Sequence, residues 1–217
     1  MTAGDEVHAA QLLVVAALAL PSAAVAYEAG SVTDGGTIKG KGVYQGAVPT
    51  RKILPTKEQA PCGEGREEPQ IAVGPDKGGQ DAVVYLKGVP WQRSPRTLAM
   101  DQRGMKFVPL VLPAVAGDTV DFLNNDGVEH NVFSPEPDPF NLGTFRSGDK
   151  RSHTFDEAGA YKIRCSIHPE MLGWIFVSDS PFAVAVDRKG RFSLANVPPG
   201  TYQLAAWNPN VEGPEKT

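Results

Sequence analysis

Short apolar runs separated by turn-forming residues recur along the chain, and no long segment carries the 3.6-residue period of an amphipathic helix. Gly and Pro, at 23 and 19 residues, bound most of these runs. The pattern predicts an all-β protein, and several short strands of this kind favour a sandwich. The runs expected to be strands are residues 38–44, 82–86, 108–115, 119–123, 161–165 and 174–177.

Alternation of apolar and polar residues indicates which side chains point inward. In the run 161–165 the apolar side chains, Cys165 among them, share one face and two basic side chains take the other. Cys165 is therefore expected to end a strand and to point into the protein. The run 119–123 leads into Asn-Asn-Asp-Gly at 124–127, a strong turn signal, and His130 follows just beyond it.

Three further stretches are interpreted from their composition. Residues 50–77 are rich in charged residues, Gln, Pro and Gly, which predicts a long surface loop. Residues 133–150 contain three prolines and are predicted to form a second long loop beside the ligand-type histidine that precedes them. Near the C-terminus, runs at 190–194 and 201–207 flank Val-Pro-Pro-Gly and are expected to pair as a hairpin.

The N-terminal residues differ from the rest of the chain. A nearly unbroken apolar run over 9–20 precedes Ala-Val-Ala at 24–26, which is the outline of a secretory signal peptide cleaved before Tyr27. Twelve residues rise about 18 Å as a helix, which is short of the ~30 Å hydrocarbon core of a bilayer. We therefore expect residues 1–26 to be removed during export rather than kept as an anchor.

Composition and charge narrow the possible classes of function. Apolar residues make up 41% and charged residues 21%, as in ordinary soluble globular proteins. Loss of Asp5 and Glu6 with the leader leaves 23 of the 25 acidic residues against 21 basic ones, a net charge of -2. That balance gives no indication of nucleic-acid binding, and no Gly-rich phosphate loop indicates a nucleotide enzyme.

Candidate metal chemistry centres on His130, Cys165, His168 and Met171, which offer two imidazoles, a thiolate and a thioether. This is the donor set of a blue-copper site, where two His and one Cys form a trigonal plane and Met lies further away on the axis. Cys165, His168 and Met171 belong to one short loop between two expected strands, so they can converge. Sulfur favours Cu(I) and nitrogen favours Cu(II), so the pattern predicts one copper ion that changes oxidation state.

Alternative interpretations of these residues remain open. Zinc is the competing metal, although structural zinc normally takes four Cys or His ligands and does not use Met. A disulfide between Cys62 and Cys165 would be expected from the cysteine count of an exported chain and would remove the thiolate. The ligand-type residues that neighbour Cys165 favour a copper site over a zinc site and over a disulfide. His153 is interpreted as a strand residue on the solvent face, and the ring edge of His168 is expected to be the part of the site nearest solvent.

Residues 107–177, about a third of the chain, resemble the plastocyanin and pseudoazurin branch of the cupredoxins, and the short loop from His168 to Met171 is most similar to that of amicyanin. The chain after the leader also looks like exported bacterial proteins labelled plastocyanin-like or methylamine-utilisation proteins. The motifs that carry the resemblance are 115–120, 124–126, 130–132, Phe155, Gly159, Tyr161, Cys165, His168 and Met171.

The resemblance implies a Greek-key cupredoxin β-sandwich. It assigns His130, Cys165 and His168 as equatorial copper ligands, Met171 as the axial ligand, and Asn131 as a residue that braces the ligand loops. The expected division of the chain is a signal peptide over 1–26, N-terminal strands with a long loop covering the sandwich over 27–95, a copper-binding core over 96–180, and a C-terminal β-hairpin appendage over 181–217, similar to carboxypeptidase-regulatory sandwiches.

The function that follows is that of a periplasmic type 1 copper protein that carries single electrons between redox proteins. The chain is expected to be a monomer without a membrane span after cleavage, and not an enzyme. Multicopper oxidases and nitrite reductases place a His directly beside the ligand cysteine, whereas Arg164 and Ser166 flank Cys165 here. Two other functions stay open: a copper carrier or store, and a structural binding module with copper as a staple.

Overall fold

The computed structural model of the protein describes residues 32, 34–54, 65–89 and 93–211. The expected leader over 1–26 and Cys62 lie outside these residues. The part of the chain that is described contains no helix that is both long and apolar enough to cross a membrane.

The described chain is built from strands and one short 3-10 helix, which confirms the all-β class. In chain order they are β1 (Gly36–Lys41), β2 (Thr50–Ile53), β3 (Arg66–Pro69), η1 (Pro75–Lys77), β4 (Val83–Lys87), β5 (Thr97–Gln102), β6 (Phe107–Val108), β7 (Val111–Val115), β8 (Asp118–Asn124), β9 (His130–Ser134), β10 (Phe140–Phe145), β11 (Lys150–Phe155), β12 (Gly159–Arg164), β13 (Leu172–Ser178), β14 (Ala183–Ala185), β15 (Arg191–Val197) and β16 (Gln203–Trp207). Each of the six runs expected to be strands overlaps one of these elements.

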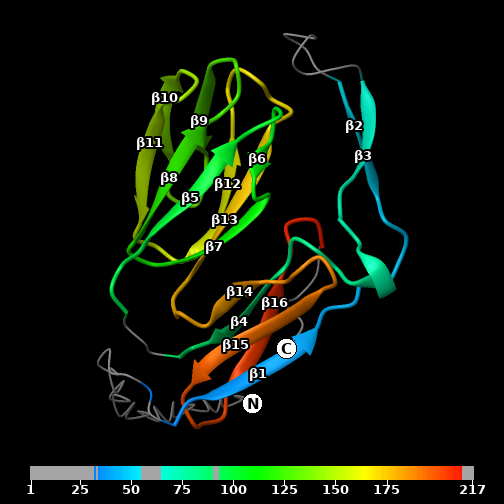
Figure 1. Ribbon diagram of the computed structural model, residues 1–217, viewed down its shortest axis with the longest axis vertical. Coiled ribbons are helices and arrows are strands. Elements are labelled where there is room, and N and C mark those ends of the chain that lie inside the picture. The colour runs from blue at the N-terminus through cyan, green and yellow to red at the C-terminus, as the bar shows by residue number, and fades with distance from the viewer. Residues whose placement is uncertain (1–31, 33, 55–64, 90–92, 212–217) are drawn as a thin grey trace, which may run out of the picture.

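Two sheets form the larger sandwich, with strand orders β10-β9-β12-β13-β7 and β11-β8-β5-β6. Figure 1 shows them as two layers facing one another. The alternation expected from the sequence is confirmed, because Val120 and Phe122 of β8 and Tyr161 and Ile163 of β12 are fully buried. These side chains meet in one core cluster, which also contains Cys165. The core therefore reaches the end of β12, where the candidate site begins.

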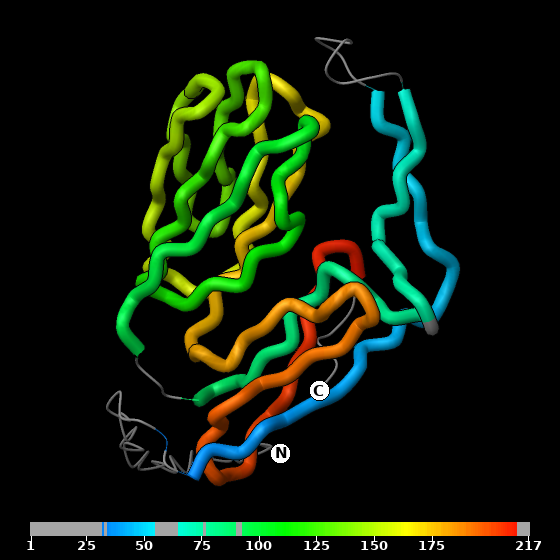
Figure 2. Tube along the Cα trace, in the orientation of Figure 1, coloured from blue at the N-terminus to red at the C-terminus, as the bar shows by residue number. Residues whose placement is uncertain are grey.

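A second, smaller module pairs β1 with β15 and β4 with β14 and β16. The hairpin expected between 190–194 and 201–207 is wrong in its pairing, since β15 lies against β1 and β16 against β4. The N-terminal segment thus supplies two strands to the module of the C-terminal strands (Figure 2). Apolar runs identify strands, but pairing with partners more than 100 residues away leaves no local signal.

The two stretches expected to be long loops also contain strands. Within 133–150, β10 pairs with β9, and the three prolines are confined to the connection between them. Pro lacks a backbone N–H and is tolerated there, so its abundance concealed the strand that follows. Within 50–77, β2 and β3 form an antiparallel hairpin, called the arm below, which stands beside the sandwich in Figure 1.

Aromatic side chains join the two modules. The ring of Trp174 on β13 lies 5.6 Å from that of Trp207 on β16, and Phe176 lies 5.1 Å from Trp207. Tyr85 on β4 completes the group at 4.8 Å from Phe176. Trp174 follows the candidate ligand loop by only a few residues. The second module therefore packs against β13, the strand that leads away from the site.

Candidate metal centre

Three of the four predicted ligands converge at one end of the sandwich. His130 opens β9, Cys165 directly follows β12, and His168 lies in the turn between β12 and β13. Their ligand atoms all lie within 4.8 Å of one another. Their side chains are only 0%, 1% and 1% exposed. The structure therefore places two imidazoles and a thiol in a closed site, contributed by two neighbouring strands of one sheet.

The distances among these atoms suit a single metal ion. Nδ1 of His130 lies 3.0 Å from Nδ1 of His168, and Sγ of Cys165 lies 3.8 Å from Nδ1 of His168. With metal–nitrogen and metal–sulfur bonds of about 2.0 and 2.3 Å, atoms that share one ion lie roughly 3 to 4 Å apart. Nitrogen and sulfur donors of this kind are those that copper prefers. The residues present therefore fit a copper ion.

Met171, the fourth predicted ligand, is held next to this group. Its backbone N–H donates to the carbonyl of His168 at 3.0 Å, closing a tight turn that carries both residues. The side chain is 1% exposed and belongs to the same buried cluster as Cys165. A buried thioether in this position also packs as an ordinary core residue, so its role at the metal is part of the proposal below.

Asn131 links the elements that carry the ligands. Its backbone N–H donates to Sγ of Cys165 at 3.3 Å, and its side-chain oxygen accepts from the N–H of Ser166 at 3.2 Å. Its amide group donates to Asn141 on β10 at 2.8 Å. The sulfur also accepts from the N–H of His168 at 3.4 Å. Two N–H groups aimed at one sulfur stabilise negative charge on it, and the Asn131 side chain holds the Cys165 loop against β9.

Asp126 is a functional residue that sequence reasoning missed. Its carboxylate lies 3.0 Å from Nε2 of His130 and accepts from the N–H groups of Gly104 and Met105 at 2.6 and 2.9 Å. A carboxylate only accepts, so Nε2 carries the proton and Nδ1 keeps its lone pair for the centre. The spacing of Asp126 four residues before His130, inside the turn signal, was the available clue.

The ring edge of His168 is expected to be the part of the site nearest solvent, but the residue is 1% exposed, the same as Cys165 and Met171, so its exposure does not distinguish it from them. The expectation for His153 is correct in placing it in a strand, β11, and wrong in placing it on the solvent face. His153 is half-buried, with its ring stacked on Phe140 at 3.9 Å and edge-on to Phe155 at 4.8 Å. Burial lowers the pKa of His153, and the charges of Asp138 and Asp156 oppose that shift. Strand alternation alone did not reveal that β10 folds over this face of β11.

Comparison with protein families gives two matches. Residues 96–178 match the copper-binding proteins of the plastocyanin/azurin family, a segment that contains all four predicted ligands. Residues 158–217 match domain II of polysaccharide lyase family 4. No curated protein matches the chain.

Several solved structures are similar to the chain. They include a copper-containing nitrite reductase from Thermus scotoductus SA-01, at 30% identity over 41% of this chain and 23% of that one, with a TM-score of 0.37. The chain thus spans less than a quarter of the reductase. A purple cupredoxin from Nitrosopumilus maritimus is 31% identical over 37% of this chain and 99% of that one, with a TM-score of 0.35. Amicyanin from Paracoccus versutus is 28% identical over 38% of this chain and 81% of that one, with a TM-score of 0.36.

Proposed function

We propose, from the premise that residues 96–178 make this chain a cupredoxin-like protein of the copper-binding plastocyanin/azurin family, that it carries single electrons on one copper ion. The ion would be held by His130, Cys165 and His168, with Met171 on the axis. The observation that carries the proposal is the buried cluster of two imidazoles and one thiol whose ligand atoms lie within 4.8 Å of one another.

Burial and bracing suit electron transfer. Copper bound to nitrogen and sulfur together supplies two oxidation states that one ligand set tolerates. The chain keeps its donors in place through the Asp126 contact to His130 and the Asn131 contacts to the Cys165 loop. Donors that are already oriented move little between states, which lowers the reorganisation barrier. Arg164 and Ser166 beside Cys165 favour a carrier over an enzyme that relays electrons to a second centre.

Cyclic voltammetry of the copper-loaded protein tests this proposal. We expect one reversible one-electron wave with a small separation between its oxidation and reduction peaks, because the ligand atoms need little rearrangement. A protein that stores copper would keep Cu(I) and lose or rearrange the ion on oxidation. An irreversible wave, or loss of copper after one cycle, would therefore favour storage and contradict the carrier.

We further propose that the carrier works in the periplasm, with redox proteins as partners. The apolar run over 9–20 and the Ala-Val-Ala triplet support export with cleavage before Tyr27. N-terminal sequencing of protein recovered from the periplasmic fraction is expected to begin at Tyr27. Intact Met1 in the membrane fraction would instead show that the segment anchors the chain.

A further inference from the structure

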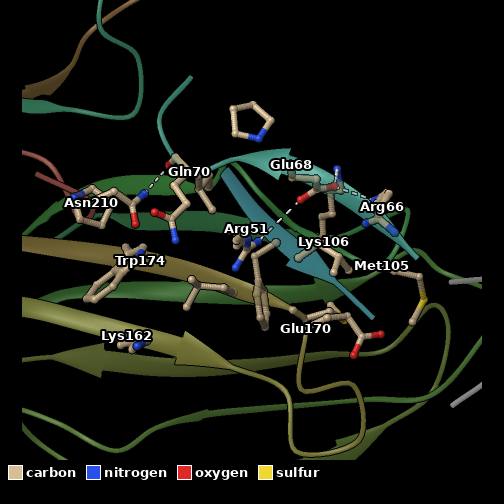
Figure 3. A pocket seen from close by; sticks show the side chains of 17 residues that line it. Arg51, Arg66, Glu68, Gln70, Met105, Lys106, Lys162, Glu170, Trp174 and Asn210 are labelled. Carbon is tan, nitrogen blue, oxygen red and sulfur yellow. Dashed lines mark hydrogen bonds and ion pairs between the residues drawn. The ribbon is translucent and has the colours of Figure 1, made fainter. Parts of the chain in front are cut away.

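A cavity of about 430 Å³ lies between the arm and the sandwich, next to the candidate metal centre. The arm contributes side chains of β2 and β3, the sandwich contributes the β5–β6 turn and parts of β12 and β13, and the segment after β16 closes one end. Figure 3 shows Arg51 and Glu68 of the arm on one side and Trp174 and Glu170 of the sandwich on the other. The volume is within the range of small-molecule sites, about 300–1,000 Å³.

Positive charge dominates the walls of this cavity. Four cationic side chains line it against two acidic ones, a formal balance of +2; the cations are Arg51, Arg66, Lys106 and Lys162, and the acids are Glu68 and Glu170.

Glu68 gathers three of these cations at the arm side of the cavity. Its carboxylate lies 2.8 Å from Arg66, 2.9 Å from Lys106 and 3.7 Å from Arg51. Burial raises the pKa of Glu68, but the hydrogen bonds from Lys106 and Arg66 outweigh it and hold that pKa below its ordinary value. Glu68 therefore stays ionised and fixes a cationic cluster where the arm meets the β5–β6 turn.

The opposite wall is apolar and carries an acceptor. Trp174 and Leu110 line it, with Lys162 lying 5.6 Å from the centre of the Trp174 ring. Oε1 of Glu170 is buried and has no hydrogen-bond partner among the described residues. A buried carboxylate oxygen without a partner is costly, and because Glu170 lines the cavity, a donor group brought to that oxygen would relieve the cost.

The cavity also touches the metal centre through two methionines. Met171 forms part of its wall, and so does Met105, whose backbone N–H is held by the Asp126 carboxylate that binds His130. An occupant of the cavity would therefore contact Met171 directly and would reach the His130 side of the cluster through Met105 and Asp126.

We propose that this cavity binds a small aromatic anion that carries a hydrogen-bond donor, such as a hydroxybenzoate, beside the copper centre. Its acidic group would face the Arg51 and Lys106 side, its ring would lie against Trp174, and its donor would reach Glu170. The regulatory consequence, a change in copper properties through Met171, rests on the proposed function, whereas the binding itself does not.

Methyl NMR of the full-length protein tests the binding with 4-hydroxybenzoate as the probe. The chain has four methionines, of which Met105 and Met171 line the cavity while Met100 is fully buried in the sandwich core and does not. With ¹³C-methyl methionine, we expect saturable shifts of the Met105 and Met171 signals and a stationary Met100 signal, in metal-free and Cu(I)-loaded protein alike. Shifts confined to metal-free protein would place the probe at the metal ligands and overturn the proposal.

Analogues and variants identify the contacts. Removing the charge, in methyl 4-hydroxybenzoate, is expected to weaken binding about tenfold, and removing the donor, in benzoate, about fivefold. Arg51→Gln should lower the affinity for the probe about tenfold. Lys52 is its exposed neighbour on β2 and does not line the cavity, so Lys52→Gln should leave the affinity unchanged.

A second variant covers the possibility that Arg51→Gln disturbs the arm. Lys162→Gln on β12 alters the opposite wall and is also expected to weaken the probe. Equal affinity for the acid and its ester, or no saturable shift at all, would overturn the proposal. Because binding of the probe is also measured in metal-free protein, the two proposals are tested separately. Failure of the probe to bind would not contradict the electron-carrier proposal, and failure of the protein to bind copper would not contradict the proposed binding in the cavity.

Discussion

Replacing Cys165 with Ser is expected to remove the intense visible absorption of the Cu(II)-loaded protein entirely. That absorption arises from charge transfer between a short-bonded equatorial thiolate and copper. Among the residues that the structure describes, Cys165 supplies the only thiol of the ligand cluster. The hydroxyl of Ser is a harder and much weaker donor. We therefore also expect the variant to hold copper less tightly.

A matched control lies one residue away. The side chain of Ser166 is exposed, and the contact of this residue to Asn131 is made by its backbone N–H. Ser166→Ala removes the hydroxyl and keeps that contact. This control should keep the colour and the copper. Absorption spectra of both variants at equal copper loading make the comparison, and an intense band in Cys165→Ser would show that the thiolate is not a ligand.

The largest expected loss of stability comes from Asp118→Ala at the start of β8. The Asp118 side chain is fully buried, accepts from the N–H groups of Arg96 and Val115 at 2.8 and 2.9 Å, and pairs with the guanidinium of Arg93. Removing the carboxylate leaves a largely buried cation and two N–H groups without their acceptor. We expect the free energy of unfolding to fall by about 3–5 kcal/mol, measured by urea titration.

Asp121 on the same strand provides the control. Its carboxylate pairs with Lys150, whose side chain is 60% exposed, and such surface pairs contribute about 0–1 kcal/mol. Asp121→Ala should therefore change the free energy of unfolding far less than Asp118→Ala. Similar losses for both variants would mean that the Asp118 network contributes no more than a surface ion pair.

The same network predicts a dependence on pH. Burial raises the pKa of Asp118, but hydrogen bonds from Arg93 and from the backbone of Arg96 and Val115 outweigh it and hold that pKa below its ordinary value. The stabilisation is therefore fully present above about pH 4, the ordinary pKa of Asp, and is lost as the pH falls through the folded-state pKa. The difference in stability between wild type and Asp118→Ala should shrink on acidification, and a constant difference would contradict this account.

Local patterns predicted the parts of the site that depend on local structure. Alternation in β12 was enough to place Cys165 inside, and the 124–127 turn was enough to bring His130 to the same end of the sandwich. The short loop after Cys165 has room for only one tight turn, so the nearness of His168 also followed. These features depend on spacing along the chain, which a sequence displays directly.

The rest of the structure depends on contacts between distant segments. Asp126 acts on His130 only because the β5–β6 turn, some 20 residues earlier, presents the N–H groups of Gly104 and Met105 to the same carboxylate. The pairing of β15 with β1 spans most of the chain, and the cavity exists only because the arm approaches Lys106. The spacing of residues along the chain does not indicate which distant segments come together, so these contacts could not be predicted from the sequence.

The measurement that most directly tests the copper assignment is the visible absorption spectrum of the copper-loaded protein, recorded oxidised and then reduced. If His130, Cys165, His168 and Met171 bind one ion, the oxidised protein shows an intense thiolate-to-copper band at one copper per chain. That band disappears on reduction and returns fully on reoxidation. A pale spectrum of the kind that nitrogen and oxygen ligands give Cu(II), or a band that does not return, would contradict the assignment.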